Sequence, residues 1–415
     1  MTTPRGLACA AVLSVALVGC GAAPAPASPS ASGGSTAPAS ATAGSSAGAL
    51  ASEPWTEVDP IQPSAVLDAP SLAPGYQCHP CHYLAENQLF GVAPTPAGLI
   101  AVGVQQPPAQ AIAFSSADGT HWIGTPGFRG VAGTTAIAVT AAGGRTVIVG
   151  LDPSGATTWA SDGGAWTQAP AQADLHVSYA AGAMTSVTPF DGGFVAGGYR
   201  DDPLHAAASA AIWRSRDGLT WTADDARGAF AGGRIWGVTA NSRAVVAVGT
   251  NGDPNYGPAA AWRWTQATGW QRARISPDSS GAMRAVVATA TGFVAVGLNG
   301  HDDGAGAWIS PDGLTWTAVP DQPSFHYYTF GMRMQSLVVG PRGLVAGGWR
   351  SDAAKGSGVT WTSKDGIAWQ LPTWQPSFAG GQITGVAVGA GGVVAVGRTG
   401  YPDWNQAAIW RTDAP

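Results

Sequence analysis

The motif with the most specific chemical pattern is Cys78-His79-Pro80-Cys81-His82. Its C-x-x-C-H spacing is the attachment pattern of c-type haem, with His82 as the axial ligand. Two cysteines and two histidines also offer ligands to a metal ion, although they lie closer together in sequence than zinc-finger ligands. Among haem, a metal ion, free thiols and a disulfide we predict the disulfide Cys78–Cys81. It needs only an oxidising exterior, whereas a haem needs a pocket and usually a second axial ligand.

A second group of residues with binding chemistry follows the short apolar runs of the chain. These segments combine Arg, Asp, Asn or His with aromatic residues, which suits a sugar or peptide ligand. Asp and Asn also serve as ordinary turn residues, and an Asp-rich segment offers oxygen ligands to Ca²⁺ without a spacing that specifies a site. The candidate ligand residues are Arg200, Asp201, His205, Asp253, Tyr256, His301, Asp302, Arg350, Asp352, Arg398, Tyr401 and Trp404. Further aromatic candidates lie in the segments between repeats: Phe230, His326, Tyr327, Tyr328, Trp374 and Phe378.

Catalytic chemistry is restricted by a shortage of carboxylates. Glutamate occurs only at positions 53, 57 and 86. A glycosidase generally needs two carboxylates at a set separation. A carbohydrate-active hydrolase would therefore have to use aspartates of the polar segments, namely Asp201, Asp202, Asp302 or Asp303. Adjacent residues of an extended chain point to opposite sides, so neither Asp-Asp doublet is a catalytic pair by itself. The sequence holds no nucleophile elbow, phosphate-binding loop or dinucleotide fingerprint, so no catalytic residue is predicted.

The composition excludes several classes of protein. Charged residues make up 11% of the 415 residues and hydrophobic residues 45%, which is too apolar for a disordered chain and too poor in charge for a coiled coil. The net charge is -5, which argues against binding to nucleic acid. Gly 59 and Pro 31 point to a chain with many turns.

The elements that must position these residues come from a repeat. Seven short apolar runs end in glycine, and the final glycines are 47, 48, 51, 48, 51 and 49 residues apart. This period is typical of a four-stranded propeller blade. The seven glycines are Gly103, Gly150, Gly198, Gly249, Gly297, Gly348 and Gly397.

A second motif follows each run by about twenty residues, as in Ser215-Arg216-Asp217-Gly218-Leu219-Thr220-Trp221. The aspartate can accept backbone N–H bonds across a tight turn, glycine can adopt a positive φ, and the tryptophan can wedge against a neighbouring blade. The residues with this structural role are Asp118, Trp122, Asp162, Trp166, Asp217, Trp221, Asp312, Trp316, Asp365 and Trp369. Two copies are degraded, because the one at Ser161 is a residue short and the one between Thr265 and Trp270 lacks Asp-Gly.

This motif resembles the Asp box of sialidase-like (BNR) repeats, and the resemblance covers nearly all of residues 54–415. It implies an all-β fold, a β-propeller. Sialidases of this fold use a Tyr nucleophile assisted by a Glu, and three arginines that bind the sialate carboxylate. This chain has no matching Glu, arginine triad or Arg-Ile-Pro element, and Phe128-Arg129-Gly130 is a poor substitute. The resemblance therefore extends to the repeat and not to sialidase activity.

The seventh copy of the repeat stops after Ile409-Trp410-Arg411-Thr412-Asp413, and the missing outer strand is found at Trp55-Thr56-Glu57-Val58. We therefore predict a seven-bladed β-propeller in which the N-terminal strand closes the last blade. Closure pairs an edge that would otherwise be exposed. This strand order places the turns between first and second strands on one face, together with the Asp boxes. The polar candidate residues then lie on the opposite face, where long loops usually carry function.

The N-terminus has the features of an export signal over residues 1–19. Arg5 provides positive charge, and Leu7 to Gly19 is an apolar run of 13 residues, too short to span a bilayer. The run ends in Leu17-Val18-Gly19-Cys20, which resembles a bacterial lipobox and implies lipidation of Cys20. Cys20 would then anchor the protein to the membrane.

The segment between this signal and the repeats is almost wholly Ala, Pro, Ser, Gly and Thr. We expect a disordered tether over residues 20–52 and the propeller over residues 53–415.

The sequence therefore predicts an exported, lipid-anchored, monomeric propeller at the cell envelope that binds a protein or glycan ligand. It predicts no nucleic-acid partner and no cofactor, and it favours a binding module over an enzyme. The alternatives are a secreted carbohydrate-active hydrolase that uses loop aspartates, and a c-type haem electron-transfer lipoprotein.

Overall fold

A computed structural model gives the fold of the chain. It describes residues 55–58, 86–175, 182–202, 207–224, 228–253, 257–277, 281–300, 304–326, 331–351, 356–372, 378–389, 391–400 and 406–412. These residues belong to one compact unit, Glu53–Pro415. Within them, no helix has the length and apolar character that a membrane crossing requires.

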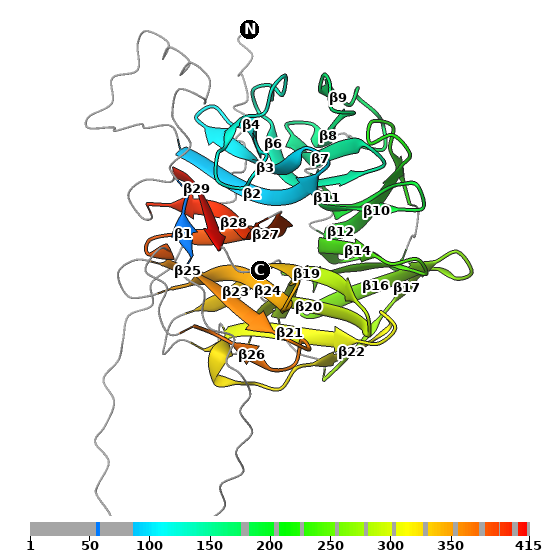
Figure 1. Ribbon diagram of the computed structural model, residues 1–415. Coiled ribbons are helices and arrows are strands. Elements are labelled where there is room, and N and C mark those ends of the chain that lie inside the picture. Colours follow the sequence, from blue (N-terminus) through cyan, green and yellow to red (C-terminus); the bar gives the residue numbers. More distant parts are fainter. Residues whose placement is uncertain are drawn as a thin grey trace, which may run out of the picture. The chain divides into compact units, whose positions relative to one another are not determined.

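The described residues form seven sheets, called blades 1 to 7 here, that follow one another along the chain (Figure 1). Blade 1 contains β2 (Glu86–Thr95), β3 (Gly98–Gln106), β4 (Gln110–Ser116) and β5 (Ile123–Gly124). Blade 2 contains β6 (Thr135–Ala142), β7 (Arg145–Asp152), β8 (Gly155–Ser161) and β9 (Thr167–Gln168). Blade 3 contains β10 (Gly182–Phe190), β11 (Gly193–Asp202), β12 (Ala207–Ser215) and β13 (Thr222–Ala223). Blade 4 contains β14 (Gly233–Ala240), β15 (Val245–Asn251), β16 (Ala259–Thr265) and β17 (Gly269–Arg272).

The remaining blades have the same order of strands. Blade 5 contains β19 (Gly281–Thr289), β20 (Gly292–Asn299), β21 (Gly304–Ser310) and β22 (Thr315–Ala318). Blade 6 contains β23 (Met332–Gly340), β24 (Gly343–Arg350), β25 (Ser357–Ser363) and β26 (Trp369–Gln370), and the short 3-10 helix η2 (Pro323–Phe325) precedes it. Blade 7 contains β27 (Gln382–Gly389), β28 (Gly392–Thr399), β29 (Gln406–Thr412) and β1 (Thr56–Glu57).

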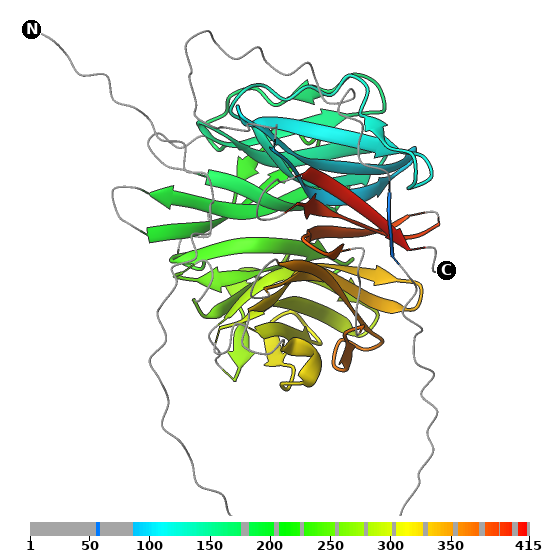
Figure 2. The same cartoon turned by 90° about the vertical axis from the view of Figure 1, so that its left-hand side faces the viewer.

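The first strands of the blades form a closed ring. Each of them contacts the first strand of the next blade, and β27 of blade 7 contacts β2 of blade 1. The Thr384 hydroxyl in β27 donates a hydrogen bond of 2.6 Å to the Leu89 carbonyl in β2. Strand β1 pairs with β29, so that Thr56 lies opposite Arg411 and Glu57 opposite Trp410, and Figure 2 shows the two strands side by side. The predicted seven-bladed β-propeller, closed by its N-terminal strand, is confirmed.

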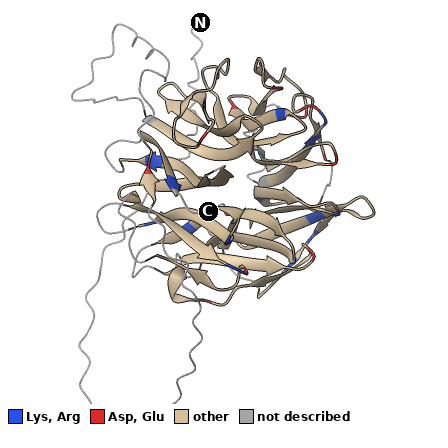
Figure 3. Ribbon diagram, in the orientation of Figure 1, with Lys and Arg blue, Asp and Glu red and all other residues tan. Residues whose placement is uncertain are grey.

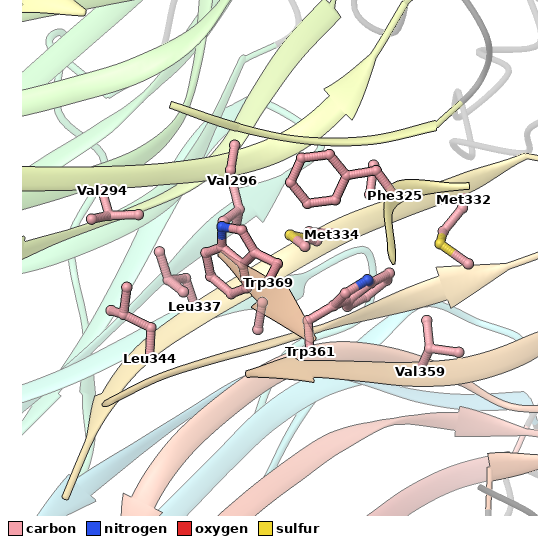
Figure 4. Close-up of a cluster of buried hydrophobic side chains, with 13 residues drawn as sticks. Val294, Val296, Phe325, Met332, Met334, Leu337, Leu344, Val359, Trp361 and Trp369 are labelled. Atoms are coloured by element: carbon pink, nitrogen blue, oxygen red, sulfur yellow. The ribbon is translucent and has the colours of Figure 1, made fainter. Parts of the chain in front are cut away.

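The core is divided among the blade interfaces. Among the described residues, seven clusters of buried hydrophobic side chains each join two neighbouring blades. Figure 4 shows the cluster between blades 5 and 6, where Trp361 and Trp369 pack with Phe325 and with valines of β20. Most blades also bury a tryptophan of the third strand almost completely, a position that the repeat motifs did not single out. These tryptophans are Trp159, Trp213, Trp262, Trp308, Trp361 and Trp410.

The glycine that ends each apolar run is required by a β-bulge. Each first strand has a register shift at the same place, for example between Ile235 and Gly237 in β14. Beside this bulge, a Cβ on Gly249 would lie 1.8 Å from the Arg234 carbonyl oxygen. The corresponding distances at the other six glycines lie between 1.8 and 2.0 Å. A bulge bends a strand and changes the direction of a side chain, and here it places Trp236 and Arg284 at the bulge positions.

Two features differ from a regular repeat. Blade 5 has a fifth strand, β18 (Arg274–Ser276), which runs parallel to β22. Phe230 is 5% exposed and Phe378 0% exposed, so the prediction that they belong to a ligand surface is wrong. Both rings pack in edge or tilted contacts with core tryptophans and contribute to the blade interfaces.

Candidate functional site

Those of the predicted ligand residues that the structure describes lie at one end of the blades, where second strands lead to third strands. We call this end the loop face. Arg200 lies in β11, Asp253 follows β15, Arg350 ends β24 and Arg398 lies in β28, while Asp201 pairs with Ala208 in the ladder of β11 and β12. The other predicted ligand residues lie outside the described residues: His205, Tyr256, His301, Asp302, Asp352, Tyr401 and Trp404.

Two of the predicted arginines make hydrogen bonds with other residues of the propeller. Arg200 donates to the Asp174 carbonyl oxygen and lies 5.2 Å from the ring centroid of Trp213. Burial lowers the pKa of Arg200, and the charge of Asp174 opposes this shift. Arg398 donates a hydrogen bond of 3.0 Å to Gln382 Oε1.

Three arginines that the sequence analysis did not select lie in first strands, in the half nearer the loop face. Arg234 in β14, Arg284 in β19 and Arg333 in β23 lie near the starts of the first strands of blades 4, 5 and 6. We call these three residues the axial arginine cluster, because the first strands line the ring axis. Each guanidinium lies over an aromatic ring: Arg234 is 4.4 Å from Tyr199, Arg284 4.6 Å from Trp236 and Arg333 5.1 Å from Trp349.

The aromatic rings connect these arginines across blades. Tyr199 of blade 3 and Trp236 of blade 4 are in edge contact, with centroids 5.9 Å apart. Arg234, Tyr199, Trp236 and Arg284 therefore form one continuous set of contacts over three blades. Cation–π contacts hold a guanidinium in a fixed orientation while it stays charged.

The charges of this cluster influence one another. The pKa of Arg284 is lowered to about 9, mainly by loss of solvent and also by the positive charge of Arg333, while Asp253 acts in the opposite direction. Arg284 therefore stays cationic at neutral pH, at a cost in free energy. Asp253, one of the predicted ligand residues, is close enough to act on the cluster.

This arrangement suits the binding of an anion. Guanidinium groups bind carboxylates through two parallel N–H bonds, and the stacked rings add apolar surface beside them. In the described part of the chain, no three His, Cys, Asp or Glu side chains are grouped so as to hold a metal ion.

The signal for the cluster is present in the sequence but is weak. Arg234 and Arg333 stand two residues before the bulge position of their strands, and Arg284 stands at the bulge position itself. Aligning the repeats on their final glycines places Arg234 and Arg333 in one column. Without the bulge, nothing indicates which of these side chains reach the axis.

The opposite end of the blades, which we call the Asp-box face, uses its carboxylates in the turns. Asp217 Oδ1 accepts hydrogen bonds from the backbone N–H of Leu219 at 2.9 Å and of Thr220 at 2.7 Å. Asp118, Asp312 and Asp365 accept the equivalent pairs. Partial burial raises the pKa of Asp217, but the hydrogen bonds from Thr220, Leu219 and Ser215 together lower it more.

The shortened copy in blade 2 has different chemistry. Asp162 pairs with Arg145 through two contacts of 2.6 Å, and this hydrogen bonding lowers the pKa of Asp162. Arg145 also donates to the Asp217 carbonyl oxygen of blade 3 at 2.6 Å. An ion pair within blade 2 thus takes the place of the backbone hydrogen bonds, and its arginine also makes a hydrogen bond to blade 3. Figure 3 shows that the charged residues lie mainly in turns and near strand ends.

Comparisons with known proteins bear on the fold. The chain is similar to YCF48 bound to D1 peptide, with a TM-score of 0.55, 13% identity, and coverage of 88% of this chain and 97% of that chain. It is also similar to the WD40 β-propeller domain of Doa1, with a TM-score of 0.48, 15% identity, and coverage of 79% of this chain and 94% of that chain. A third similar structure is a glycosyl hydrolase from Bacteroides ovatus, with a TM-score of 0.36, 11% identity, and coverage of 55% of this chain and 86% of that chain. At 13% identity, the likeness to YCF48 shows a shared β-propeller fold alone. No protein-family model and no curated protein matches the sequence.

Several predicted sites lie outside the described residues. These are the lipidation residue Cys20, the disulfide cysteines Cys78 and Cys81, and the haem ligand candidate His82. The aspartates of the alternative hydrolase are not described either. Residues 301–303 lie outside the described residues, and the structure does not describe the side chains of Asp201 and Asp202. All of these remain predictions.

Proposed function

We propose that this propeller is a binding module whose loop face takes an acidic segment of a partner protein. The observation that carries the proposal is the axial arginine cluster, in which Arg234, Arg284 and Arg333 are each stacked on an aromatic ring. Three cations from successive blades meet there, on a protein whose net charge is -5. A local excess of positive charge on an acidic protein steers an anionic ligand to that place.

The energetics of Arg284 support an anionic ligand. Burial and Arg333 both disfavour its charge, so a carboxylate beside Arg284 would recover part of that cost. Stacked rings and arginines are also the residue types that contribute most to protein interfaces. The similar propeller YCF48 was solved with a peptide bound, and a peptide segment is the class of ligand that we propose for this chain.

The proposal is tested by fluorescence anisotropy with a labelled glutamate-rich peptide and the full chain. We expect saturable binding that weakens with salt. We also expect a loss of at least about 100-fold in affinity when Arg234, Arg284 and Arg333 are changed to Gln, because each guanidinium–carboxylate pair contributes about 1 kcal/mol or more. The matched control changes Arg272, Arg274 and Lys364, three exposed cations of other surfaces, to Gln. An equal loss of affinity in both triple variants would show that peptide binding depends only on net charge, and this would contradict the proposal.

We also propose that the protein acts outside the cytoplasm, anchored through a lipid on Cys20 with a Cys78–Cys81 disulfide. The support is the sequence pattern of residues 1–52 and the Cys-x-x-Cys spacing. The intact mass of the exported protein tests both ideas. We expect cleavage before Cys20, added acyl mass, and two hydrogens gained on reduction. A mass that includes one covalent haem would contradict the disulfide and favour an electron-transfer protein.

A further inference from the structure

A hollow of about 880 Å³ lies on the Asp-box face, at the opposite end of the blades from the axial arginine cluster. The turns between the first and second strands of blades 2, 3 and 4 line it, together with Asp-box residues of blades 2 and 3 and the third-strand end of blade 4. Its volume falls within the range of small-molecule sites, about 300–1,000 Å³.

The walls of the hollow are aromatic and rigid. Phe190 and Trp264 line it and contact each other edge to face, with centroids 5.6 Å apart. Arg214 lies 4.0 Å from the Trp264 centroid and fixes that ring from outside the lining. Rings held in this way offer flat apolar surface to a ligand without further ordering.

The charged side chains that line the hollow differ in whether they make ion pairs or hydrogen bonds. Arg145 pairs with Asp162, and Arg216 donates to the carbonyl oxygen of Asp191 and to its carboxylate. Asp191 has φ 50°, the one positive value for a non-glycine residue in the described part of the chain. Arg216 therefore holds an unusual turn in place, and the Asp191 carboxylate remains 72% exposed.

Two exposed side chains of the lining are not engaged. Within the described residues, no hydrogen bond or ion pair holds the guanidinium of Arg243 or the amide of Gln266. The lining has three arginines and two aspartates, so it carries one excess positive charge, and Arg243 is the cation without a counter-charge.

We propose that this hollow is a binding site for an oligosaccharide that carries an acidic sugar. Hydroxyl groups both donate and accept hydrogen bonds, so they match a lining that mixes carboxylates, guanidiniums and an amide. The apolar C–H faces of sugar rings match the walls of Phe190 and Trp264. A peptide with several acidic side chains fits less well, because Arg243 is, among the described residues, the one cation of the lining without a counter-charge. The acidic group of the sugar pairs with Arg243.

The test is calorimetric titration of the full chain with two tetrasaccharides of equal length, one neutral and one with a single glucuronate. We expect the acidic one to bind at least about fivefold more tightly. Arg243→Gln should remove this difference, and Gln266→Ala should weaken both sugars by about threefold. Neither side chain is buried, so both variants should fold.

The matched control is Arg342→Gln, which removes an exposed arginine from the equivalent turn of blade 6, outside the hollow. It should leave both affinities unchanged. Failure of both sugars to bind, or equal loss in the Arg243 and Arg342 variants, would overturn the site. Because the axial arginines are not involved, peptide binding by the same samples reports separately on the function proposed for the loop face.

Discussion

The two faces of this propeller hold charged residues in opposite ways. On the Asp-box face, Asp217 and its three counterparts receive backbone hydrogen bonds, which hold their pKa below the ordinary value. On the loop face, Arg284 is stacked on Trp236, and its charge is disfavoured first by burial and then by the nearby Arg333. The first arrangement stabilises the fold, and the second costs free energy that a ligand can recover. The aspartates of the repeat therefore have a structural role, because the turns of the repeat itself supply their hydrogen-bond partners.

The largest effect is expected from Gly249→Ala. A Cβ there would lie 1.8 Å from the Arg234 carbonyl oxygen, so the bulge beneath the arginine cluster must move. We expect a loss of about 3 kcal/mol or more in unfolding free energy, measured by denaturant titration. The control is Gly252→Ala, which has a positive φ of 78° and open space around it; it should lose only about 1 kcal/mol. Equal losses would mean that the close approach of the two strands is not needed.

Low pH should destabilise the fold through the aspartates of the Asp-box face. The folded pKa values of Asp118, Asp217, Asp312 and Asp365 lie below their ordinary value of 3.8. Their contribution to stability is present above that value and is lost as the pH falls through the lower folded values. We expect the thermal unfolding midpoint to fall steadily between about pH 4 and pH 2. A midpoint that stays constant over this range would show that the carboxylates do not support the turns.

Replacing a single aspartate should lower the unfolding free energy more in an intact Asp box than in a degraded one. Asp217→Ala removes the acceptor of two backbone N–H groups, so we expect a loss of about 1–2 kcal/mol. Asp162→Ala breaks only an ion pair whose carboxylate is largely exposed, so we expect no measurable loss of unfolding free energy. Denaturant titration of the two variants measures the difference. A larger loss at Asp162 would reverse the assignment of roles.

The smallest effect should be a gain in stability, whereas the changes above cause a loss. Arg284→Met removes a charge that its surroundings disfavour and keeps a long side chain against Trp236. We expect a rise in the unfolding midpoint of about 1–3 °C at pH 7, together with weaker peptide binding. Calorimetry measures the first and anisotropy the second. A lower midpoint with unchanged binding would make Arg284 a structural residue.

The sequence predicted the propeller because its repeat has a strict steric cause. Glycine is the only residue that fits beside the bulge, so the period of the fold is visible at Gly103, Gly249 and their counterparts. Ring closure could be predicted because Trp55-Thr56 supplies the half repeat that is missing after Trp410. The axial arginines could not be predicted, because the glycines that mark the bulge do not indicate which neighbouring side chains it turns toward the ring axis.

The central claim is that the loop face binds an acidic segment at the axial arginine cluster. Hydrogen–deuterium exchange with and without the glutamate-rich peptide locates the contact directly. We expect slower exchange at the loop-face ends of β14, β19 and β23, near Arg234, Arg284 and Arg333, and no change in the turns that contain Asp217, Asp312 and Asp365. Slower exchange confined to those turns, or no change at saturating peptide, would contradict the account.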